Sequence, residues 1–113
     1  MPTRRNDLSF YDRMAARWWD RSAKIYALHH LNPLRFEYFD CFISNWQELR
    51  VLDVGCGGGY TCEFLAKRGA IVSGIDQSQA CIHSAIDHAK QHNQNIGYQQ
   101  GYAEASPYAD RSF

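Results

Sequence analysis

The sequence has no excess of charge of either sign, because 12 lysine and arginine residues balance 12 aspartate and glutamate residues. Proteins that bind nucleic acid usually concentrate positive charge against the phosphates, so the composition gives no support for a nucleic-acid partner. No apolar run approaches the ~20 residues of a membrane-spanning helix, and residues 1–10 lack the apolar core of a signal peptide. These absences predict a soluble chain whose partner must be found from a binding site.

Cysteine is also scarce, with four residues and no CxxC pair. The cysteines have neither the paired spacing nor the density of a secreted disulfide scaffold, so we expect buried, reduced thiols and a cytoplasmic location. The length of 113 residues and the hydrophobic content of 45% fit one globular domain or a piece of one. The sequence makes no prediction about the oligomeric state.

Two helices are predicted before the middle of the chain. Apolar spacing favours a helix over residues 9–19. A second helix is expected to begin with Asn32 as its N-cap and Pro33 at the first helical position, and to end near residues 45–48. The expected apolar stripe of this second helix comprises Leu34, Tyr38, Phe42 and Trp46.

Strand and helix patterns alternate over the rest of the chain. Three apolar stretches predict strands, at residues 51–54, 70–75 and 96–100. Residues 60–68 predict a helix that ends at Gly69, and Ser78 is the expected N-cap of another helix. The order strand, helix, strand, helix, strand indicates an α/β fold with parallel strands joined by right-handed crossovers.

Glycine is concentrated in the expected turn after the first strand. That turn contains Gly55, Gly57, Gly58 and Gly59. In an open parallel sheet this turn faces the ligand, and glycine lets the backbone adopt positive φ and lets a ligand approach it. The helix that follows presents the positive end of its dipole to the same place. The pattern is typical of sites for phosphate, a dinucleotide or S-adenosylmethionine.

The residues after the turn separate these ligands. A phosphate-binding P-loop requires lysine and then serine or threonine after its last glycine, whereas Tyr60, Thr61 and Cys62 follow Gly59. The dinucleotide sequence GxGxxG requires glycine at position 60 or 62, where this chain has tyrosine and cysteine. A nicotinamide-binding oxidoreductase module is therefore the weaker alternative.

Residues 52–59, followed by Asp76 at the end of the second strand, resemble the first two cofactor motifs of class I S-adenosylmethionine-dependent methyltransferases. The resemblance implies the N-terminal half of a Rossmann-like fold, with cap helices at 1–48 and an incomplete cofactor-binding domain at 49–113. The cofactor contacts that it implies are made by Asp53, Gly55, Gly57, Gly59 and Asp76. The Asp76 carboxylate is suited to accept hydrogen bonds from the ribose hydroxyls, and Asp53 to meet the cofactor's ammonium group.

Two stretches nearer the N-terminus resemble one particular group of these methyltransferases. The sequences "WWD" at residues 18–20 and "LHHLNPLRFEYF" at residues 28–39 resemble the ubiquinone-biosynthesis O-methyltransferases. Members of that family methylate a phenolic hydroxyl of a polyprenylated quinone precursor, and the resemblance implies this reaction here. It also assigns Arg35 to the cofactor, since a guanidinium can pair bidentately with the methionine carboxylate. The alternatives are another small phenol or lipid head group as acceptor, or a non-catalytic remnant.

The chain departs from the family pattern in two places. Tyr102 stands where many methyltransferases place an acid for the adenine amino group, so either the backbone at Ala103 or the carboxylate of Glu104 is expected to substitute. The family continues past "ADRSF" into a fourth strand, so we expect the chain to be an N-terminal fragment that is inactive alone. No residue is a convincing catalytic base, and His29 is the weak candidate.

Four other residues have two interpretations. His88 and His92 are spaced by one helical turn, but the sequence shows no third ligand, so we expect a solvated helix face and no metal site. Trp18 and Trp19 lie among basic residues, where they pack a cap helix, lie against a membrane surface or close over the quinone ring.

Overall fold

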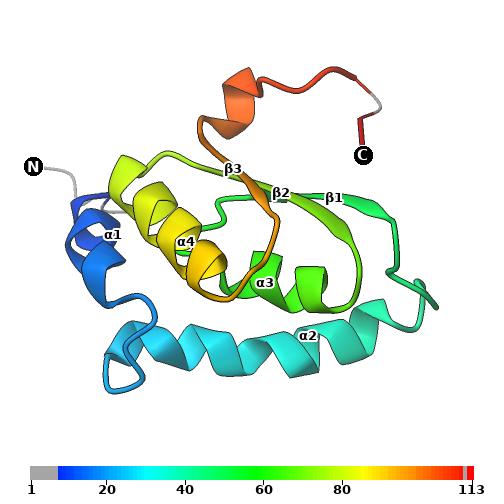
Figure 1. Cartoon of the computed structure of the whole chain (residues 1–113), viewed down its shortest axis with the longest axis horizontal. Helices are drawn as coiled ribbons and strands as arrows, with labels where there is room; N and C mark the ends of the chain where they lie inside the picture. The colour runs from blue at the N-terminus through cyan, green and yellow to red at the C-terminus, as the bar shows by residue number, and fades with distance from the viewer. Residues whose placement is uncertain (1–7, 111) are drawn as a thin grey trace, which may run out of the picture.

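The structure is a computed structural model that describes residues 8–110, 112 and 113. Its centre is a sheet of three parallel strands in the order β1-β2-β3, namely β1 (Arg50–Val54), β2 (Ile71–Asp76) and β3 (Gly97–Gln100). Two helices, α3 (Tyr60–Lys67) and α4 (Gln79–Gln91), connect the strands and cover one side of the sheet (Figure 1). The α/β class predicted from the sequence is therefore confirmed.

The register of the strands brings their carboxyl ends to one edge of the sheet. Val54 pairs with Ile75, and Asp76 pairs with Gln100. The amide of Gly55 continues this ladder by donating to the carbonyl oxygen of Ile75 at 2.8 Å. The glycine-rich turn and the ends of β2 and β3 are consequently neighbours in space, as expected for a parallel sheet.

The turns that join these elements agree with the sequence predictions. Gly69 follows α3 with a φ of 89°, a conformation that glycine adopts without steric cost. Ser78 is the N-cap of α4, and its hydroxyl oxygen accepts a hydrogen bond from the amide of Cys81 at 3.1 Å. Both signals depend on neighbours along the chain, which explains why the sequence alone locates them.

The buried side chains form two clusters. The first joins the sheet, α3 and α4 to residues that precede β1, and it comprises Phe36, Trp46, Cys56, Cys62, Leu65, Val72 and Ile82. The second packs residues 15–25 onto the starts of α3 and α4, and it comprises Ala15, Trp18, Ala23, Ile25, Tyr60 and Cys81. All four cysteines are free, but the prediction that they are buried is wrong for Cys41, which is exposed.

The N-terminal segment differs most from the sequence prediction. It comprises α1 (Leu8–Met14), the 3-10 helices η1 (Ala15–Arg17) and η2 (Lys24–Leu31), and α2 (Asn32–Phe39). The first α-helix thus ends at Met14 and tightens into a 3-10 turn, and the second ends at Phe39, well before residues 45–48. Both predicted C-termini are wrong.

The early end of α2 has a long-range cause. The carboxylate of Asp40, which follows the helix, accepts hydrogen bonds from the indole of Trp46 at 2.7 Å and from the guanidinium of Arg68 at 2.8 Å. The resulting bend returns Trp46 against Phe36, with ring centroids 5.3 Å apart. Helical periodicity in the sequence contains no information about these partners.

The predicted apolar stripe of α2 is also wrong. Leu34, Tyr38 and Phe42 are 66%, 64% and 74% exposed, whereas the buried side of the helix consists of Asn32 and Phe36. These two residues are spaced by i, i+4 and therefore share one helical face, which packs against α3. The stripe of larger apolar residues lies on the other side of the helix.

Asn32 is not the N-cap that the sequence suggested. Because η2 runs directly into α2, Leu31 occupies the N-cap position with helical φ and ψ angles of −76° and −23°. The buried side chain of Asn32 accepts a hydrogen bond from the hydroxyl of Thr61 at 3.1 Å instead. Pro33 does lie in the first turn, as predicted.

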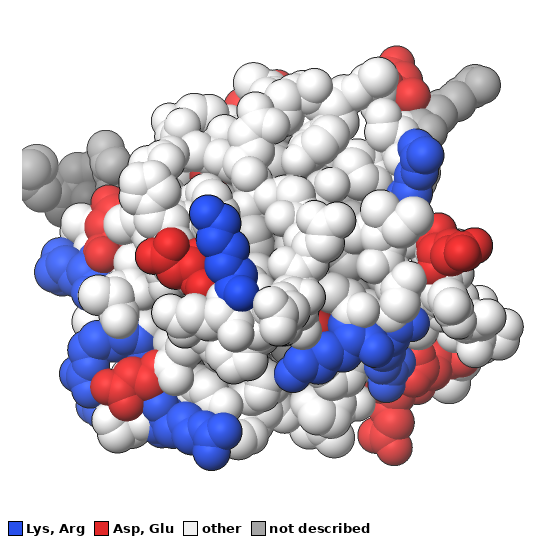
Figure 2. Space-filling model, viewed as in Figure 1, with Lys and Arg blue, Asp and Glu red and all other residues white. Residues whose placement is uncertain are grey.

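The described sheet has an open edge at β1. β1 is an edge strand, and Val54 and Ile71 are exposed. The C-terminal segment with η3 (Ala103–Ala105) leaves the sheet on the side away from α3 and α4 (Figure 1). Charges of both signs are interspersed on the face shown in Figure 2, in line with the balanced composition.

No helix among the described residues is both long enough and apolar enough to cross a membrane. Residues 1–7, on which part of the signal-peptide prediction depends, lie outside the described residues.

Candidate functional site

A hollow of about 370 Å³ opens at the carboxyl ends of β1 and β2. It is lined by Tyr11, Trp18, Leu28, Val54, Gly55, Gly57, Ile75, Asp76, Gln77, Ser78, Gly101 and Ala103. Four residues predicted from the sequence to contact a cofactor are among them, namely Gly55, Gly57, Asp76 and Ala103. Arg35, Asp53 and Gly59 do not line the hollow.

Gly55 is the glycine that leaves the hollow open. Its φ is 76°, a conformation that other residues rarely adopt, and a Cβ atom placed there would meet nothing within 4 Å. The space beside its Cα atom is therefore free for a ligand to approach the backbone. This is the property that the glycine-rich turn was predicted to supply.

The other glycines of the turn are explained by packing. A Cβ atom at Gly57 or Gly58 would overlap the indole of Trp18, coming within 2.8 Å of Cη2 and 2.7 Å of Nε1 respectively. A Cβ atom at Gly59 would overlap the hydroxyl of Tyr98. The glycine cluster thus has two physical causes, an open face at Gly55 and close side-chain packing at Gly57, Gly58 and Gly59.

The carboxylate of Asp76 fixes two turns at once. One oxygen accepts a hydrogen bond from the amide of Gly57 at 2.8 Å, and the other accepts from the amide of Ser78 at 2.8 Å. Each carboxylate oxygen can accept a second hydrogen bond, so both remain able to bind hydroxyl groups of a ligand in the hollow. Asp76 has a structural role in addition to the ligand role predicted for it.

Asp53 and Arg35 lie near the loop but outside the hollow. Burial raises the pKa of the Asp53 carboxyl, while a hydrogen bond from the Cys62 thiol at 3.6 Å and the positive charge of Arg35 oppose that rise. Arg35 is exposed, and it forms no ion pair within the described part of the chain. Its guanidinium keeps its hydrogen-bond donors available to a carboxylate.

In the segment that follows β3, Ala103 lies at the hollow and Glu104 does not. Ala103 begins the 3-10 turn η3 and lines the hollow, whereas Tyr102 and Glu104 do not line it; all three residues are exposed. The amide of Gly101 donates to the carbonyl oxygen of Asp76 at 3.0 Å, which holds this segment beside β2. Of the two predicted substitutes for an acidic residue, the backbone at Ala103 is the better placed.

Trp18 and Trp19 pack the N-terminal segment onto the glycine-rich turn. Trp18 is 4% exposed and stacks on Tyr60 at a centroid distance of 5.5 Å, and the Tyr60 hydroxyl donates to its carbonyl oxygen. The indole of Trp19 donates to the carbonyl oxygen of Gly58 at 2.8 Å. The packing interpretation of this pair is the one that the structure supports.

His29 belongs to an aromatic cluster and not to the hollow. Its ring lies 5.7 Å from Trp19 and 5.0 Å from Tyr26, measured between centroids. Burial, followed by the nearby charge of His30, lowers the pKa of His29 below its ordinary value of 6.5. A role as catalytic base at this hollow receives no support from its position.

Sequence reasoning missed most of the apolar wall of the hollow, including Tyr11, Leu28 and Ile75. Gln77 and Ser78 were detectable, because they directly follow Asp76 at the end of a predicted strand. Tyr11 and Leu28 were not, because they come from the N-terminal segment, whose position depends on tertiary packing.

Known proteins with similar sequences include methyltransferases. Residues 51–113 match a methyltransferase domain family. A ubiquinone biosynthesis O-methyltransferase from Saccharophagus degradans is 44% identical over 98 residues, which are 87% of this chain and 41% of that protein. The chain therefore spans about two fifths of the length of the curated relatives that it matches.

Two solved structures share the fold. The PH0226 protein from Pyrococcus horikoshii is 27% identical with a TM-score of 0.70, over 92% of this chain and 47% of its own. An S-adenosylmethionine-dependent methyltransferase from Mesorhizobium loti is 26% identical with a TM-score of 0.57, over 68% of this chain and 35% of its own. The three-stranded sheet with its helices is thus part of a class I, Rossmann-like methyltransferase fold. From the domain match and the identity to its relatives, the chain belongs to the methyltransferase family.

Proposed function

We propose that this chain forms the cofactor-binding part of an S-adenosylmethionine-dependent O-methyltransferase that acts on a phenolic hydroxyl of a quinone precursor. The observation that carries the proposal is the hollow in which Gly55 leaves the backbone open and Asp76 retains acceptor capacity on both oxygens. The name of the curated relative from Saccharophagus degradans, at 44% identity, supports the choice of acceptor.

S-adenosylmethionine is the cofactor that the family and the relative from Mesorhizobium loti indicate, and the residues of the hollow fit it. Asp76 is suited to accept the two ribose hydroxyls, and the backbone at Gly55 and Ala103 is suited to lie against the cofactor. Arg35 and Asp53 carry charges opposite to those of the cofactor's carboxylate and ammonium groups. We assign them to the methionine end on that chemistry.

The cofactor, when bound, supplies a methyl group made electrophilic by the sulfonium. The part played by this chain is to hold and orient that cofactor, because alignment of reactants accounts for much of the rate of a transfer reaction. We assign no general base among the described residues, since Asp76, whose carboxylate lines the hollow, is assigned to the ribose. β1 is an open edge of the described sheet beside the hollow, so we expect the 113-residue chain alone to transfer no methyl group.

Calorimetric titration separates the proposed cofactor from the dinucleotide alternative. We expect S-adenosylhomocysteine to bind and NAD to bind at least ~10-fold more weakly, because the turn lacks the third glycine of the dinucleotide sequence, which allows the helix to pack closely on the strand. The Asp87→Ala variant removes an exposed carboxylate from α4, outside the hollow, and should bind S-adenosylhomocysteine as tightly as the unchanged chain. Preference for NAD, or equal affinity for both, would contradict the assignment.

We also propose a cytoplasmic protein in peripheral contact with the membrane, since a polyprenylated acceptor resides in lipid. The two tryptophans pack inward, so the exposed apolar residues of α2 and its C-terminal turn, Leu34, Tyr38 and Phe42, are the better candidates for this contact. Replacing Leu34 and Phe42 with serine should reduce sedimentation of the chain with phospholipid vesicles. Sedimentation that does not change would remove this surface from consideration.

A further inference from the structure

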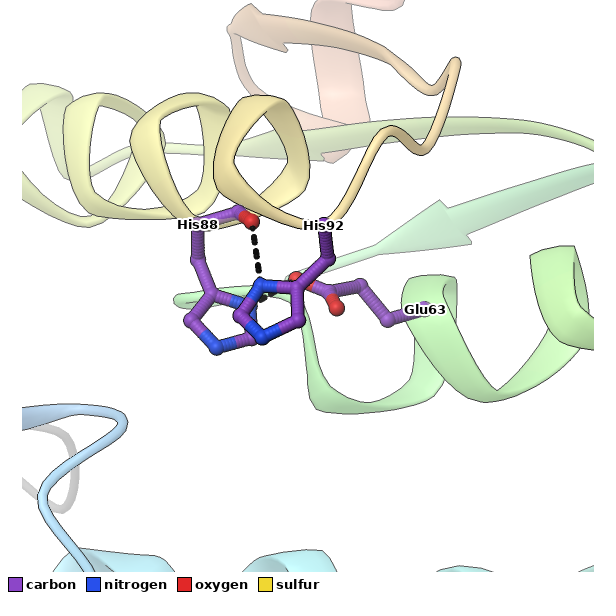
Figure 3. A group of neighbouring side chains, drawn as sticks. All are labelled: Glu63, His88 and His92. Atoms are coloured by element: carbon purple, nitrogen blue, oxygen red, sulfur yellow. Dashed lines mark hydrogen bonds and ion pairs between the residues drawn. The ribbon is translucent and has the colours of Figure 1, made fainter.

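Three potential metal ligands meet between α3 and α4. His88 and His92 extend from α4 toward Glu63 of α3 (Figure 3). Nδ1 of His88 lies 2.5 Å from Oε2 of Glu63, and one ligand atom from each of the three residues lies within 4.8 Å of the others. The sequence offers only the two histidines, and the packing of the helices supplies the third group.

Glu63 is an unusual residue for a protein interior. It is 2% exposed, and His88 is the sole hydrogen-bond or ion-pair partner of its side chain within the described part of the chain. A carboxylate offers about four acceptor positions, and burying it is costly unless they are occupied by donors or a cation. Most of that acceptor capacity is unused by the protein itself.

His92 is oriented as a metal ligand. Its Nδ1 lies 3.0 Å from the carbonyl oxygen of His88, which can only accept a hydrogen bond. The proton of the neutral ring therefore resides on Nδ1, and Nε2 presents a lone pair. Metal-binding histidines are commonly fixed in this way, with one ring nitrogen donating to a backbone carbonyl.

His88 is held in place by Trp19. The two rings are parallel within 3°, with centroids 3.6 Å apart. Trp19 is itself anchored, since its indole donates to the carbonyl oxygen of Gly58 in the glycine-rich turn. The position of the His88 ring is thus coupled to the loop that borders the cofactor hollow.

His88 can be reached from solvent. A separate hollow of about 600 Å³ lies between the N-terminal segment and α4, and His88 is part of its wall. Three carboxylates line the same hollow, those of Asp12, Asp20 and Asp87. Their negative charge favours the approach of a cation.

We propose that Glu63, His88 and His92 bind a divalent transition-metal ion of the zinc type. Imidazole and carboxylate ligands suit zinc, which commonly takes three protein ligands and a water molecule. The ion would take the place of the direct hydrogen bond between His88 and Glu63. It would tie α3 to α4 and, through Trp19, help to hold the glycine-rich turn, and its binding can be tested without the proposed methyl transfer.

The test uses the whole 113-residue chain with Cys41→Ser as background, because an exposed thiol is a competing zinc ligand. Calorimetry with zinc chloride and absorption spectra with cobalt chloride report affinity and coordination. We expect one equivalent of metal, cobalt bands in the visible range, and a melting temperature that rises with zinc. His92→Gln should weaken binding at least ~10-fold, a loss of the size seen when even supporting residues of a metal site are changed.

His83→Gln is the matched control, since His83 is an exposed histidine on the same helix outside the cluster. It should change the affinity for zinc by no more than about twofold, because substitutions at uninvolved surface positions have small effects. Glu63→Gln should also abolish binding, but its buried position puts folding at risk. His92 is exposed, so the His92→Gln variant keeps the test valid. Failure of the background chain to bind zinc, or equal affinity in the His83→Gln and His92→Gln variants, would overturn the proposal.

Discussion

Gly58 is explained by close packing against Trp18 and Gly55 by an open face, so Gly58→Ala and Gly55→Ala should change different properties of the protein. A Cβ atom at Gly58 would overlap the indole of Trp18, whereas one at Gly55 would meet no neighbour and would project into the open space of the turn. Gly58→Ala should therefore lower the stability of the fold. Gly55→Ala should chiefly lower the affinity for S-adenosylhomocysteine.

The magnitudes follow from the local geometry. Trp18 is 4% exposed and stacked on Tyr60, so it cannot move aside freely, and overpacking of this kind costs about 1–3 kcal/mol. Replacing glycine with alanine also restricts the unfolded chain, which returns roughly 0.4–1 kcal/mol. The expected net loss of stability at Gly58 is about 0–2.6 kcal/mol. At Gly55 the strain of a positive φ, about 1–2 kcal/mol, is partly offset by the same gain, which leaves about 0–1.6 kcal/mol.

Urea unfolding followed by far-ultraviolet circular dichroism measures both variants, alone and combined with Trp18→Ala. Removal of the indole is itself expected to lower the stability of the fold by about 3–5 kcal/mol. All variants are therefore measured at one fixed concentration of trimethylamine N-oxide, which stabilises the folded state. The cost of Gly58→Ala should nearly vanish in the Trp18→Ala background, and that of Gly55→Ala should not change. A Gly58→Ala cost that is the same in both backgrounds would refute the packing explanation.

Three further predictions concern charged groups. Asp76→Ala should weaken S-adenosylhomocysteine binding by roughly 1–3 kcal/mol in calorimetry and also lower the melting temperature, because the carboxylate accepts two backbone amides; a stability equal to that of wild type would contradict this double role. Arg35→Lys should reduce cofactor affinity with no change in the melting temperature without ligand, since lysine lacks the bidentate guanidinium, and parallel losses would favour a structural role. Burial lowers the pKa of His29, so the folded state binds fewer protons than the unfolded state, and stability should be full above pH 6.5 and fall as the pH drops below it. His29→Gln should flatten that decline in melting temperatures measured from pH 8 to pH 5, and an unchanged slope would rule His29 out as its source.

The part of the fold that the sequence predicted is the part specified by neighbours along the chain. Gly69 terminates α3 and Ser78 caps α4 through contacts within a few residues, and the strands between them are short apolar runs. The turn after β1 was recognisable for the same reason. In this chain these local signals agree with the fold of the whole.

The parts that the sequence did not predict depend on contacts between distant segments. The end of α2 follows from Asp40 binding Trp46 and Arg68, which no periodicity reveals. The three-residue cluster between α3 and α4 requires Glu63 to meet His88, 25 positions later. Within the candidate site, Gly55, Gly57, Asp76 and Ala103 line one hollow because the ends of parallel strands converge, and Ala103 was named through the family resemblance.

The most direct test of the central claim is to locate the bound cofactor on the chain. Amide chemical shifts of the 15N-labelled 113-residue protein, recorded during titration with S-adenosylhomocysteine, report which residues the ligand contacts. The account predicts saturable shifts at Gly55, Asp76, Gly101 and Ala103, with Gly69 and Gly97 unaffected. Saturable shifts confined to residues outside the hollow at the carboxyl ends of β1 and β2, or larger shifts at these same amides with NAD, would contradict it.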